Sequence, residues 1–177
     1  MGGSRIAIRI SSYAPDNMAI KLIECDKQKS YKLAEYMNDI IIIQGDGRNV
    51  DLLKEEGIRD MDAFIALTDS SETNILACLT AKELGVKKTI AEVENIQFIS
   101  TAERLNIGNI INKKLLAASR IFQLLLDEDS SNAKCLALSD AEVVELVAKE
   151  NSKITKAAVK DLKLPSDLTI GGLDRNG

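Results

Sequence analysis

The sequence predicts an α/β protein built on a doubly wound parallel sheet, with a small α+β lobe after it. Short apolar stretches alternate with longer helical ones along most of the chain. One stretch, residues 40–43, is four isoleucines in a row, a pattern typical of a strand buried on both faces. Glycines and polar turns separate the stretches. This alternation favours helices packed on both faces of one parallel sheet.

The first part of the domain shows two strand and helix pairs. We expect a strand at 19–25 and a helix at 28–37, because Leu33 and Met37 lie four residues apart on one helix face. The isoleucine strand at 40–43 follows. A short helix over 49–56 then ends at Gly57, since glycine is the common residue just after a helix.

The same alternation continues through the second part of the domain. A strand at 63–67 precedes a helix for which we expect Asp69 as the N-cap and Glu72 as its capping-box partner. Gly85 ends this helix. The remaining apolar patterns predict strands at 89–93 and 110–111 and helices at 97–105 and 115–126.

A polar, acidic stretch at 127–132 predicts a linker, which divides the chain into domains 1–130 and 131–177. In the second domain we expect strands at 142–147 and 168–170 and a short helix within 154–162. A unit of fewer than about 50 residues rarely folds alone. We therefore expect the second domain to be a truncated lobe that packs on a partner surface.

Composition limits the possible functions. The 177 residues carry a net charge of −4 with both signs interspersed, which argues against nucleic acid as the main ligand. Histidine is absent, which removes the commonest general base and metal ligand. The three cysteines, Cys25, Cys78 and Cys135, lack metal-ligand spacing, so we predict free, mostly buried thiols, no metal site and a cytoplasmic protein.

The first ten residues, MGGSRIAIRI, fit two interpretations. Ile6, Ile8 and Ile10 alternate with other residues, as in a half-buried strand. Alternatively, Gly2, Ser4 and Ala7 hold the three glycine positions of a dinucleotide-binding loop that opens a helix. Ser4 fits this second pattern less well, because its side chain crowds the approach of a phosphate.

Glu24 supports the nucleotide interpretation. It lies 20 residues beyond Ser4, at the end of the strand predicted at 19–25. A Rossmann-like fold places there the acid that accepts hydrogen bonds from ribose hydroxyls, and a carboxylate disfavours a 2′-phosphate. The alternative is a solvated glutamate at a strand end.

Two further loops follow predicted strands and should lie at the same edge of the sheet. Asp46 and Gly47 follow the isoleucine strand, and Asp46 has the chemistry to accept a hydrogen bond from an adenine amino group. Thr68 and Asp69 follow the next strand. The alternatives are a simple turn at 45–47 and a helix cap at Asp69.

Five blocks in order resemble the RCK or KTN regulatory domain of bacterial and archaeal potassium transporters and channels. The resemblance covers nearly the whole chain, and the tail resembles the small C-terminal lobe of the same proteins. The blocks are IIIQGDG at 41–47, LLKEEGI at 52–58, DAFIALTD at 62–69, ETNIL at 72–76 and AKELG at 81–85.

This resemblance implies a role for each candidate residue. It implies that residues 2–7 form the phosphate loop and 5–13 the first helix, with the strand before the loop missing. The chain is then similar to the second half of a two-domain subunit. By position in the family, the nucleotide-binding residues are Gly2, Gly3, Ser4, Arg5, Glu24, Asp46, Gly47, Thr68 and Asp69. Two departures are Ser4, in place of a glycine, and Glu92, where many relatives carry arginine.

The resemblance also implies ligand binding rather than catalysis. The expected ligand is NAD or NADH, with ATP or ADP as the alternative. The expected partner is an integral-membrane potassium transporter of the Trk/Ktr type, gated by dimers that assemble into a ring at the inner face of the membrane. We expect dimer contacts at 115–126, and the alternative is a core helix that closes its own domain. An NAD-dependent oxidoreductase and a scaffold that binds no nucleotide remain as alternatives.

Overall fold

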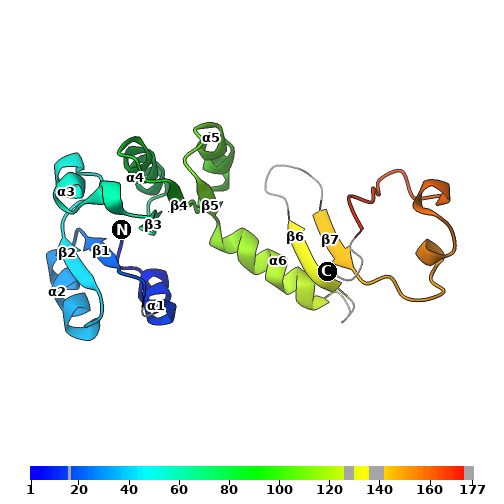
Figure 1. Ribbon diagram of the computed structural model, residues 1–177, viewed down its shortest axis with the longest axis horizontal. Coiled ribbons are helices and arrows are strands. Elements are labelled where there is room, and N and C mark those ends of the chain that lie inside the picture. Colours follow the sequence, from blue (N-terminus) through cyan, green and yellow to red (C-terminus); the bar gives the residue numbers. More distant parts are fainter. Residues whose placement is uncertain (16, 126–129, 136–141, 174–177) are drawn as a thin grey trace.

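Five parallel strands with helices between them form the first part of the chain (Figure 1). The structure is a computed structural model that describes residues 1–15, 17–125, 130–135 and 142–173. The strands lie close to the predicted positions and are β1 (Lys21–Glu24), β2 (Ile41–Gln44), β3 (Ala63–Ala66), β4 (Lys88–Glu92) and β5 (Asn109–Ile111).

The strands pair in two groups. β1 pairs with β2, with Lys21 opposite Ile41. β3 pairs with β4 and β4 with β5, and all these pairs are parallel. The parallel arrangement confirms the predicted fold class.

Met1 and Gly2 lie between the two groups of strands. The amide of Gly2 donates to the carbonyl of Ile23 in β1 (2.8 Å), and the amide of Leu67, just after β3, donates to the carbonyl of Met1 (3.0 Å). The α-amino group of Met1 donates to the carbonyl of Ile65 (2.7 Å). This short segment therefore lies between β1 and β3, in the place of the strand that the sequence analysis expected to be missing.

The first ten residues form the loop and helix of the second interpretation. Ser4 caps α1 (Arg5–Tyr13), so the alternating isoleucines do not form a strand. The other helices of this part also follow the prediction. They are α2 (Lys27–Tyr36), α3 (Val50–Glu55), α4 (Ser71–Glu83) and α5 (Ile99–Arg104), with the 3-10 turns η1 (Ile58–Asp60) and η2 (Ile96–Phe98).

The N-cap predicted for α4 is wrong by one residue. The side chain of Ser70, not that of Asp69, accepts the amide of Thr73 (3.1 Å). Asp and Ser are equally good caps, and the one that reaches the third amide of the helix takes the role. Glu72 is then a neighbour of the cap, and its carboxylate accepts a hydrogen bond from the Ser70 hydroxyl (3.2 Å).

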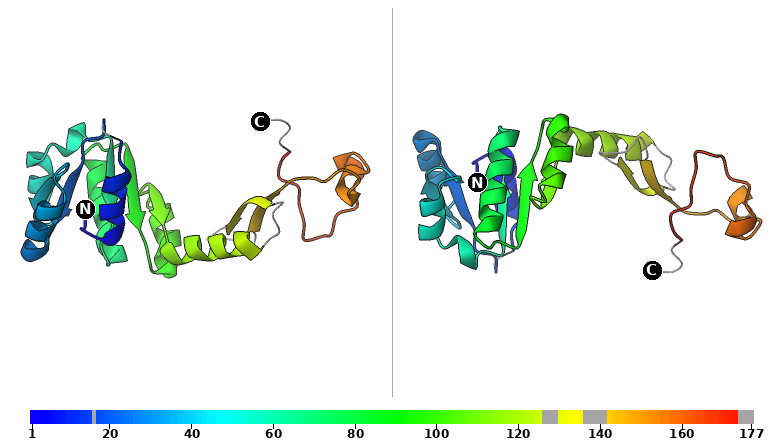
Figure 2. Two further views of the ribbon diagram at one scale, coloured as in Figure 1. Left: turned by 90° about the horizontal axis from the view of Figure 1, so that it is seen from below. Right: turned by 90° about the horizontal axis from the view of Figure 1, so that it is seen from above.

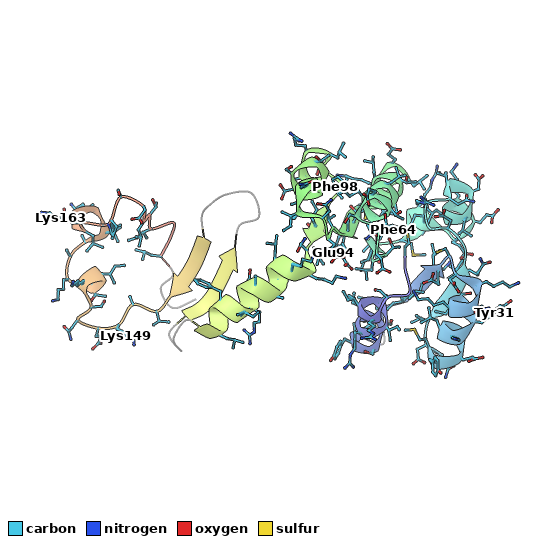
Figure 3. All side chains as sticks on the ribbon, turned by 180° about the vertical axis from the view of Figure 1, so that it is seen from behind. Tyr31, Phe64, Glu94, Phe98, Lys149 and Lys163 are labelled. Atoms are coloured by element: carbon cyan, nitrogen blue, oxygen red, sulfur yellow. The ribbon has the colours of Figure 1, made fainter. Side chains whose placement is uncertain are left out.

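The core is aliphatic, as the scarcity of aromatic residues requires. Leu53, Val93 and Ile107 are at most 1% exposed. Figure 3 labels Phe64, which is buried in this core, and Tyr31, which is exposed on α2. Burying one such aliphatic side chain contributes about 1.5–3 kcal/mol, so these contacts fix the strands and their loops in place.

Helix α6 (Lys113–Leu125) leads from the parallel strands to the C-terminal part of the chain (Figure 2). There β6 (Ser130–Cys135) and β7 (Glu142–Leu146) form an antiparallel pair. Two 3-10 turns follow, η3 (Lys153–Thr155) and η4 (Val159–Asp161). Within the described ranges, no helix is long and apolar enough to cross a bilayer.

Several predictions for this part need correction. The strand predicted at 142–147 is confirmed, but residues 168–170 are not a strand, since no neighbouring strand pairs with them in the described part of the lobe. The helix predicted within 154–162 is reduced to η3 and η4. Of the predicted linker, 127–129 lie outside the described residues and 130–132 begin β6.

Candidate functional site

The glycine loop leaves no space for side chains at its first two positions. Gly2 has φ +87°, a left-handed conformation that favours glycine, and a Cβ there would lie 3.0 Å from the backbone of Leu67. At Gly3 a Cβ would lie 2.5 Å from Cδ1 of Leu33 and 2.8 Å from Oε2 of Glu24. Both glycines are therefore required by the close approach of β3, α2 and β1 to the loop.

Ser4 occupies the position of the expected glycine because it caps α1. Its Oγ accepts the amide of Ala7 (3.3 Å), so the hydroxyl serves the first turn of the helix. The amides of Arg5 and Ile6 have no acceptor among the described residues. Such open amides, together with the helix dipole, favour an anion at the start of a helix.

Glu24 lies at the end of β1, as predicted, and directly against the loop. Its side chain is only 5% exposed, and its Oε2 accepts the amide of Gly3 (2.8 Å). The same oxygen lies 3.0 Å from Nζ of Lys29, while Oε1 accepts the amide of Asp26 (3.0 Å). The glutamate is thus buried and hydrogen-bonded, not solvated as in the alternative interpretation.

These contacts keep Glu24 ionised. Burial by itself raises the pKa of the carboxyl, but the hydrogen bonds from the amides of Asp26 and Gly3, and the ammonium of Lys29, outweigh burial. The net effect lowers the pKa of Glu24 from 4.5 to about 2. The loop therefore has a fixed negative charge beside it at neutral pH.

Asp46 and Gly47 have local roles in this structure. The guanidinium of Arg48 forms a bidentate pair with Asp46, with contacts of 3.0 Å and 2.7 Å, and its hydrogen bonds lower the pKa of that carboxyl. Gly47 is buried, and a Cβ there would lie 2.4 Å from Sδ of Met1. The 45–47 loop therefore packs against Met1, which directly precedes the glycine loop.

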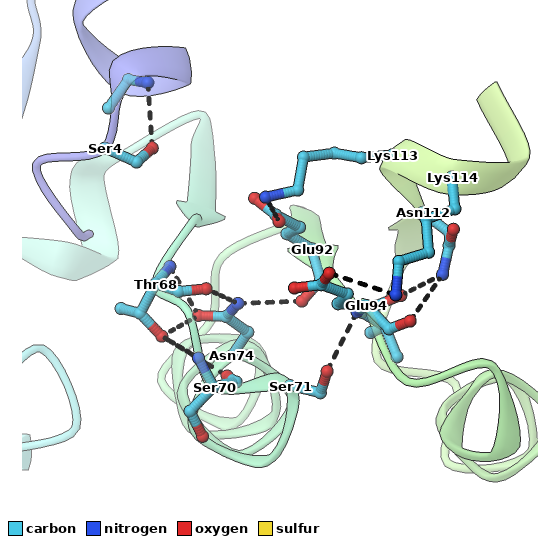
Figure 4. A network of polar contacts seen from close by, with 12 residues as sticks. Ser4, Thr68, Ser70, Ser71, Asn74, Glu92, Glu94, Asn112, Lys113 and Lys114 are labelled. Carbon is cyan, nitrogen blue, oxygen red and sulfur yellow. Dashed lines mark hydrogen bonds and ion pairs between the residues drawn. The ribbon is translucent and has the colours of Figure 1, made fainter. Parts of the chain in front are cut away.

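Thr68 is held by a buried asparagine that the sequence reasoning did not select. Oδ1 of Asn74 accepts the amide and the hydroxyl of Thr68 (3.0 and 2.7 Å), and Nδ2 donates to the carbonyls of Thr68 and Glu92 (2.8 Å each) (Figure 4). Asn74 shares a helix face with the buried Ala77, Cys78 and Ala81. A polar residue on that apolar face is the signal that could have identified it.

Glu92 is buried and paired with the first residue of α6. Its carboxylate is 4% exposed and lies 2.5 Å from Nζ of Lys113, and this hydrogen bond raises the pKa of the lysine. Glu94 lies 3.3 Å from Nζ of Lys114 on a more exposed surface (Figure 4). The negative charge of Glu92, which stands where many relatives carry arginine, is thus balanced by a lysine of the same chain.

Only some of the predicted nucleotide-binding residues lie together in the structure. Gly2, Gly3 and Glu24 come together at the ends of β1 and β3. Asp69 is exposed and lines a groove with Glu72, Glu94 and Lys114. Arg5 lines a second groove, along α1, and has no ion-pair partner in the part of the chain described here.

Cysteine placement differs in part from the prediction. Cys78 is buried and Cys25 is exposed, and both are free thiols. Burial raises the pKa of Cys78 to about 11, so this thiol is not reactive at neutral pH.

Sequence comparison finds relatives named for potassium uptake. The chain is 32% identical over 178 residues to the Trk system potassium uptake protein TrkA of Vibrio alginolyticus, a match that covers 99% of this chain and 39% of that protein. The chain therefore spans about two fifths of the length of the curated relatives it matches.

Two solved structures share the fold. One is the TrkA-N domain of the inner membrane protein ybaL from Escherichia coli, with a TM-score of 0.61 and 11% identity, over 70% of this chain and 91% of that one. The other is the GsuK channel bound to NAD, with a TM-score of 0.55 and 15% identity, over 64% of this chain and 20% of that one.

Parallel strands, a glycine loop that opens a helix and a glutamate at the end of β1 are the features of a Rossmann-like domain. The TrkA-N domain family matches residues 1–113, the region that contains all of them. The chain therefore belongs to the TrkA-N domain family.

Proposed function

We propose that this chain is a nucleotide-binding regulatory domain of a potassium uptake system. The contact between the amide of Gly3 and the carboxylate of Glu24 carries the proposal, because it joins a phosphate loop to a ribose acceptor. The relatives' names support the potassium link, and NAD on the GsuK channel supports a dinucleotide as ligand. NAD or NADH is thus the first choice, with ATP or ADP as the alternative.

Three features of the fold support such a site. The open amides of Arg5 and Ile6 would receive the phosphates, Glu24 the ribose hydroxyls, and Thr68 would line the pocket from the end of β3. The proposed roles of Asp46, Gly47 and Asp69 are weaker, since Asp46 already pairs with Arg48 and Asp69 lies in a different groove. We retain Asp46 and Gly47 as contacts near the base and Asp69 as a residue that lines the pocket beside Thr68.

Binding rather than catalysis is the role we assign. The relatives are named as potassium uptake proteins, which favours regulation over the oxidoreductase alternative. In the proposed mechanism the nucleotide binds two states of an assembly with different affinity, and this difference moves a membrane potassium transporter of the Trk/Ktr type. Coupling energies of about 1–3 kcal/mol are typical of such systems.

Calorimetric titration of the chain with NAD, NADH, ATP and ADP tests the proposal. We expect saturable binding of at least one ligand and its loss in Glu24→Ala. Glu35→Ala, an exposed glutamate on α2, is the matched control and should bind as the wild type does. Absence of heat with all four ligands would contradict ligand sensing.

A scaffold that binds no nucleotide is the second candidate. One observation favours it: Glu24 already has donors on both oxygens, so a ribose must compete for it. The same titration separates the two candidates.

Assembly into dimers and rings completes the proposal. α6 exposes large apolar residues, among them Leu116 (59% exposed), Ile121 (59%) and Leu124 (71%), which suit a contact with a second copy. We take 1–130 as the nucleotide-binding domain and 131–177 as part of the C-terminal lobe. Sedimentation should show a dimer that Ile121→Lys weakens and Leu105→Lys, on α5's exposed end, does not.

A further inference from the structure

The carboxylate of Glu24 has all of its acceptor positions in use. Oε2 accepts the amide of Gly3 (2.8 Å) and lies 3.0 Å from Nζ of Lys29. Oε1 accepts the amide of Asp26 (3.0 Å) and the thiol of Cys25 (3.5 Å). A carboxylate offers about four lone-pair positions, so a ribose hydroxyl reaches this one only where a donor leaves.

Lys29 is the donor best able to leave. The donors from Gly3 and Asp26 are backbone amides, fixed by the loop and by the start of α2. The thiol of Cys25 belongs to the residue next to Glu24 and makes a long, weak contact. The ammonium of Lys29 sits at the end of a flexible side chain that is 50% exposed, so it can turn into water at small cost.

The backbone of Lys29 stays in place when its ammonium moves. Its amide donates to Oδ1 of Asp26 (2.7 Å) in the N-cap of α2. The cation therefore remains tethered within one side-chain length of the carboxylate. A 2′-substituent on a ribose that binds to Glu24 would therefore come within reach of this cation.

We infer that Lys29 sets which nucleotides the site accepts, an inference that rests on the proposed function. A ribose with both hydroxyls free must displace the ammonium from Glu24, so Lys29 weakens the binding of NAD. A 2′-phosphate instead pairs with the displaced ammonium, which offsets the repulsion from Glu24. Lys29 thus narrows the preference for NAD over NADP that a strand-end carboxylate alone would create.

Other lysines of α2 do not share this position. Lys27 lies over the ring of Tyr31, 6.0 Å from its centroid. Lys32 is exposed and forms no ion pair among the residues the structure describes. Lys32→Met therefore removes one positive charge from the same helix without touching Glu24, and is the matched control.

Calorimetric titration of the whole chain with NAD and with NADP tests the inference. Lys29→Met should bind NAD roughly two- to fivefold more tightly, the range expected for loss of one partly exposed ion pair, and NADP more weakly. Lys29→Gln, which keeps length and polarity, should change both affinities in the same directions. Lys32→Met should leave the ratio of the two affinities at the wild-type value.

The outcomes separate this inference from the proposed function. Should NAD bind the wild type and the Lys29 variants keep its NAD to NADP ratio, the role of Lys29 is overturned and the nucleotide site stands. Should neither NAD nor NADP bind the wild type, the role of Lys29 is overturned, and the proposed function is overturned as well if ATP and ADP also fail to bind. Circular dichroism of each variant verifies that it is folded before titration.

Discussion

Oε1 of Glu92, at the end of β4, lies 2.5 Å from Nζ of Lys113, the first residue of α6. The carboxylate is 4% exposed and the ammonium is 45% exposed, so the pair joins the interior of the domain to the helix that leads out of it. Because a buried charge without a partner is costly, this contact stabilises the packing of the first turn of α6 against the end of β4.

Lys113→Met should therefore destabilise the domain. The substitution leaves the Glu92 carboxylate buried with its ion partner removed, and we expect a loss of about 1–3 kcal/mol in the free energy of unfolding by urea. Lys114→Met is the control, because Glu94 and Lys114 are both well exposed, and it should cost less than about 0.5 kcal/mol. Equal losses in both variants would contradict a special role for the Glu92–Lys113 pair.

Asn74→Ala should cost more than an ordinary polar substitution. It removes the partner of the amide of Thr68 and of the carbonyl of Glu92, both near the candidate site. Each buried group left without a partner costs about 1–3 kcal/mol, which a urea titration resolves. Asn38→Ala, at an exposed asparagine outside the helices and strands, is the comparison and should be nearly neutral. Similar urea midpoints for Asn74→Ala and Asn38→Ala would argue against the hydrogen-bond network of Asn74.

Gly3→Ala should damage stability and ligand binding together. The new Cβ would lie 2.5 Å from Leu33 and 2.8 Å from Glu24, so the loop has to shift away from β1. Overpacking of this kind typically costs about 1–3 kcal/mol, measurable by thermal melting. Gly171→Ala, where nothing lies within 4 Å of the added atom, should have the melting temperature of the wild type. A stable, fully binding Gly3→Ala variant would rule out the close packing described here.

The stability that Glu24 contributes should disappear at low pH. Its pKa is about 2 in the folded chain and 4.5 ordinarily, so its contribution is complete above pH 4.5 and declines as pH falls towards 2. The shift corresponds to about 3 kcal/mol at neutral pH. Urea unfolding of the wild type and Glu24→Gln at pH 7, 5, 4 and 3 measures this. The difference in the free energy of unfolding between the wild type and Glu24→Gln should become smaller as the pH falls. A difference that stays constant would refute the contribution assigned to Glu24.

Local patterns were enough to predict the parallel strands and their positions along the chain. The isoleucines at 40–43 predicted the strand β2 but not its burial, because β2 pairs only with β1 among the described strands and Ile41 is 57% exposed. Gly57 and Gly85 end helical segments where expected. The spacing from Ser4 to Glu24 placed the acid at the end of β1, because 20 residues span one helix and one strand of this fold. These are short-range signals, which a single sequence retains.

Side-chain partners were not predictable in the same way. Lys29 and Lys113 are ordinary lysines in ordinary helices, and only the packed fold shows which carboxylate each one meets. Residues 168–170 look like a strand, but strand formation depends on a neighbouring strand that local sequence cannot supply. Long-range pairing, rather than local preference, decides such positions.

The Met1–Gly2 segment has a consequence for how the domain opens. The hydrogen bonds from Gly2 to Ile23 and from Leu67 to Met1 tie one half of the sheet to the other across this segment. A break there separates β1 and β2 from the remaining strands while each half keeps its own ladder. The amides of Gly2 and Leu67 should then exchange with deuterium sooner than those inside β4, and a ligand that bridges the halves should slow them.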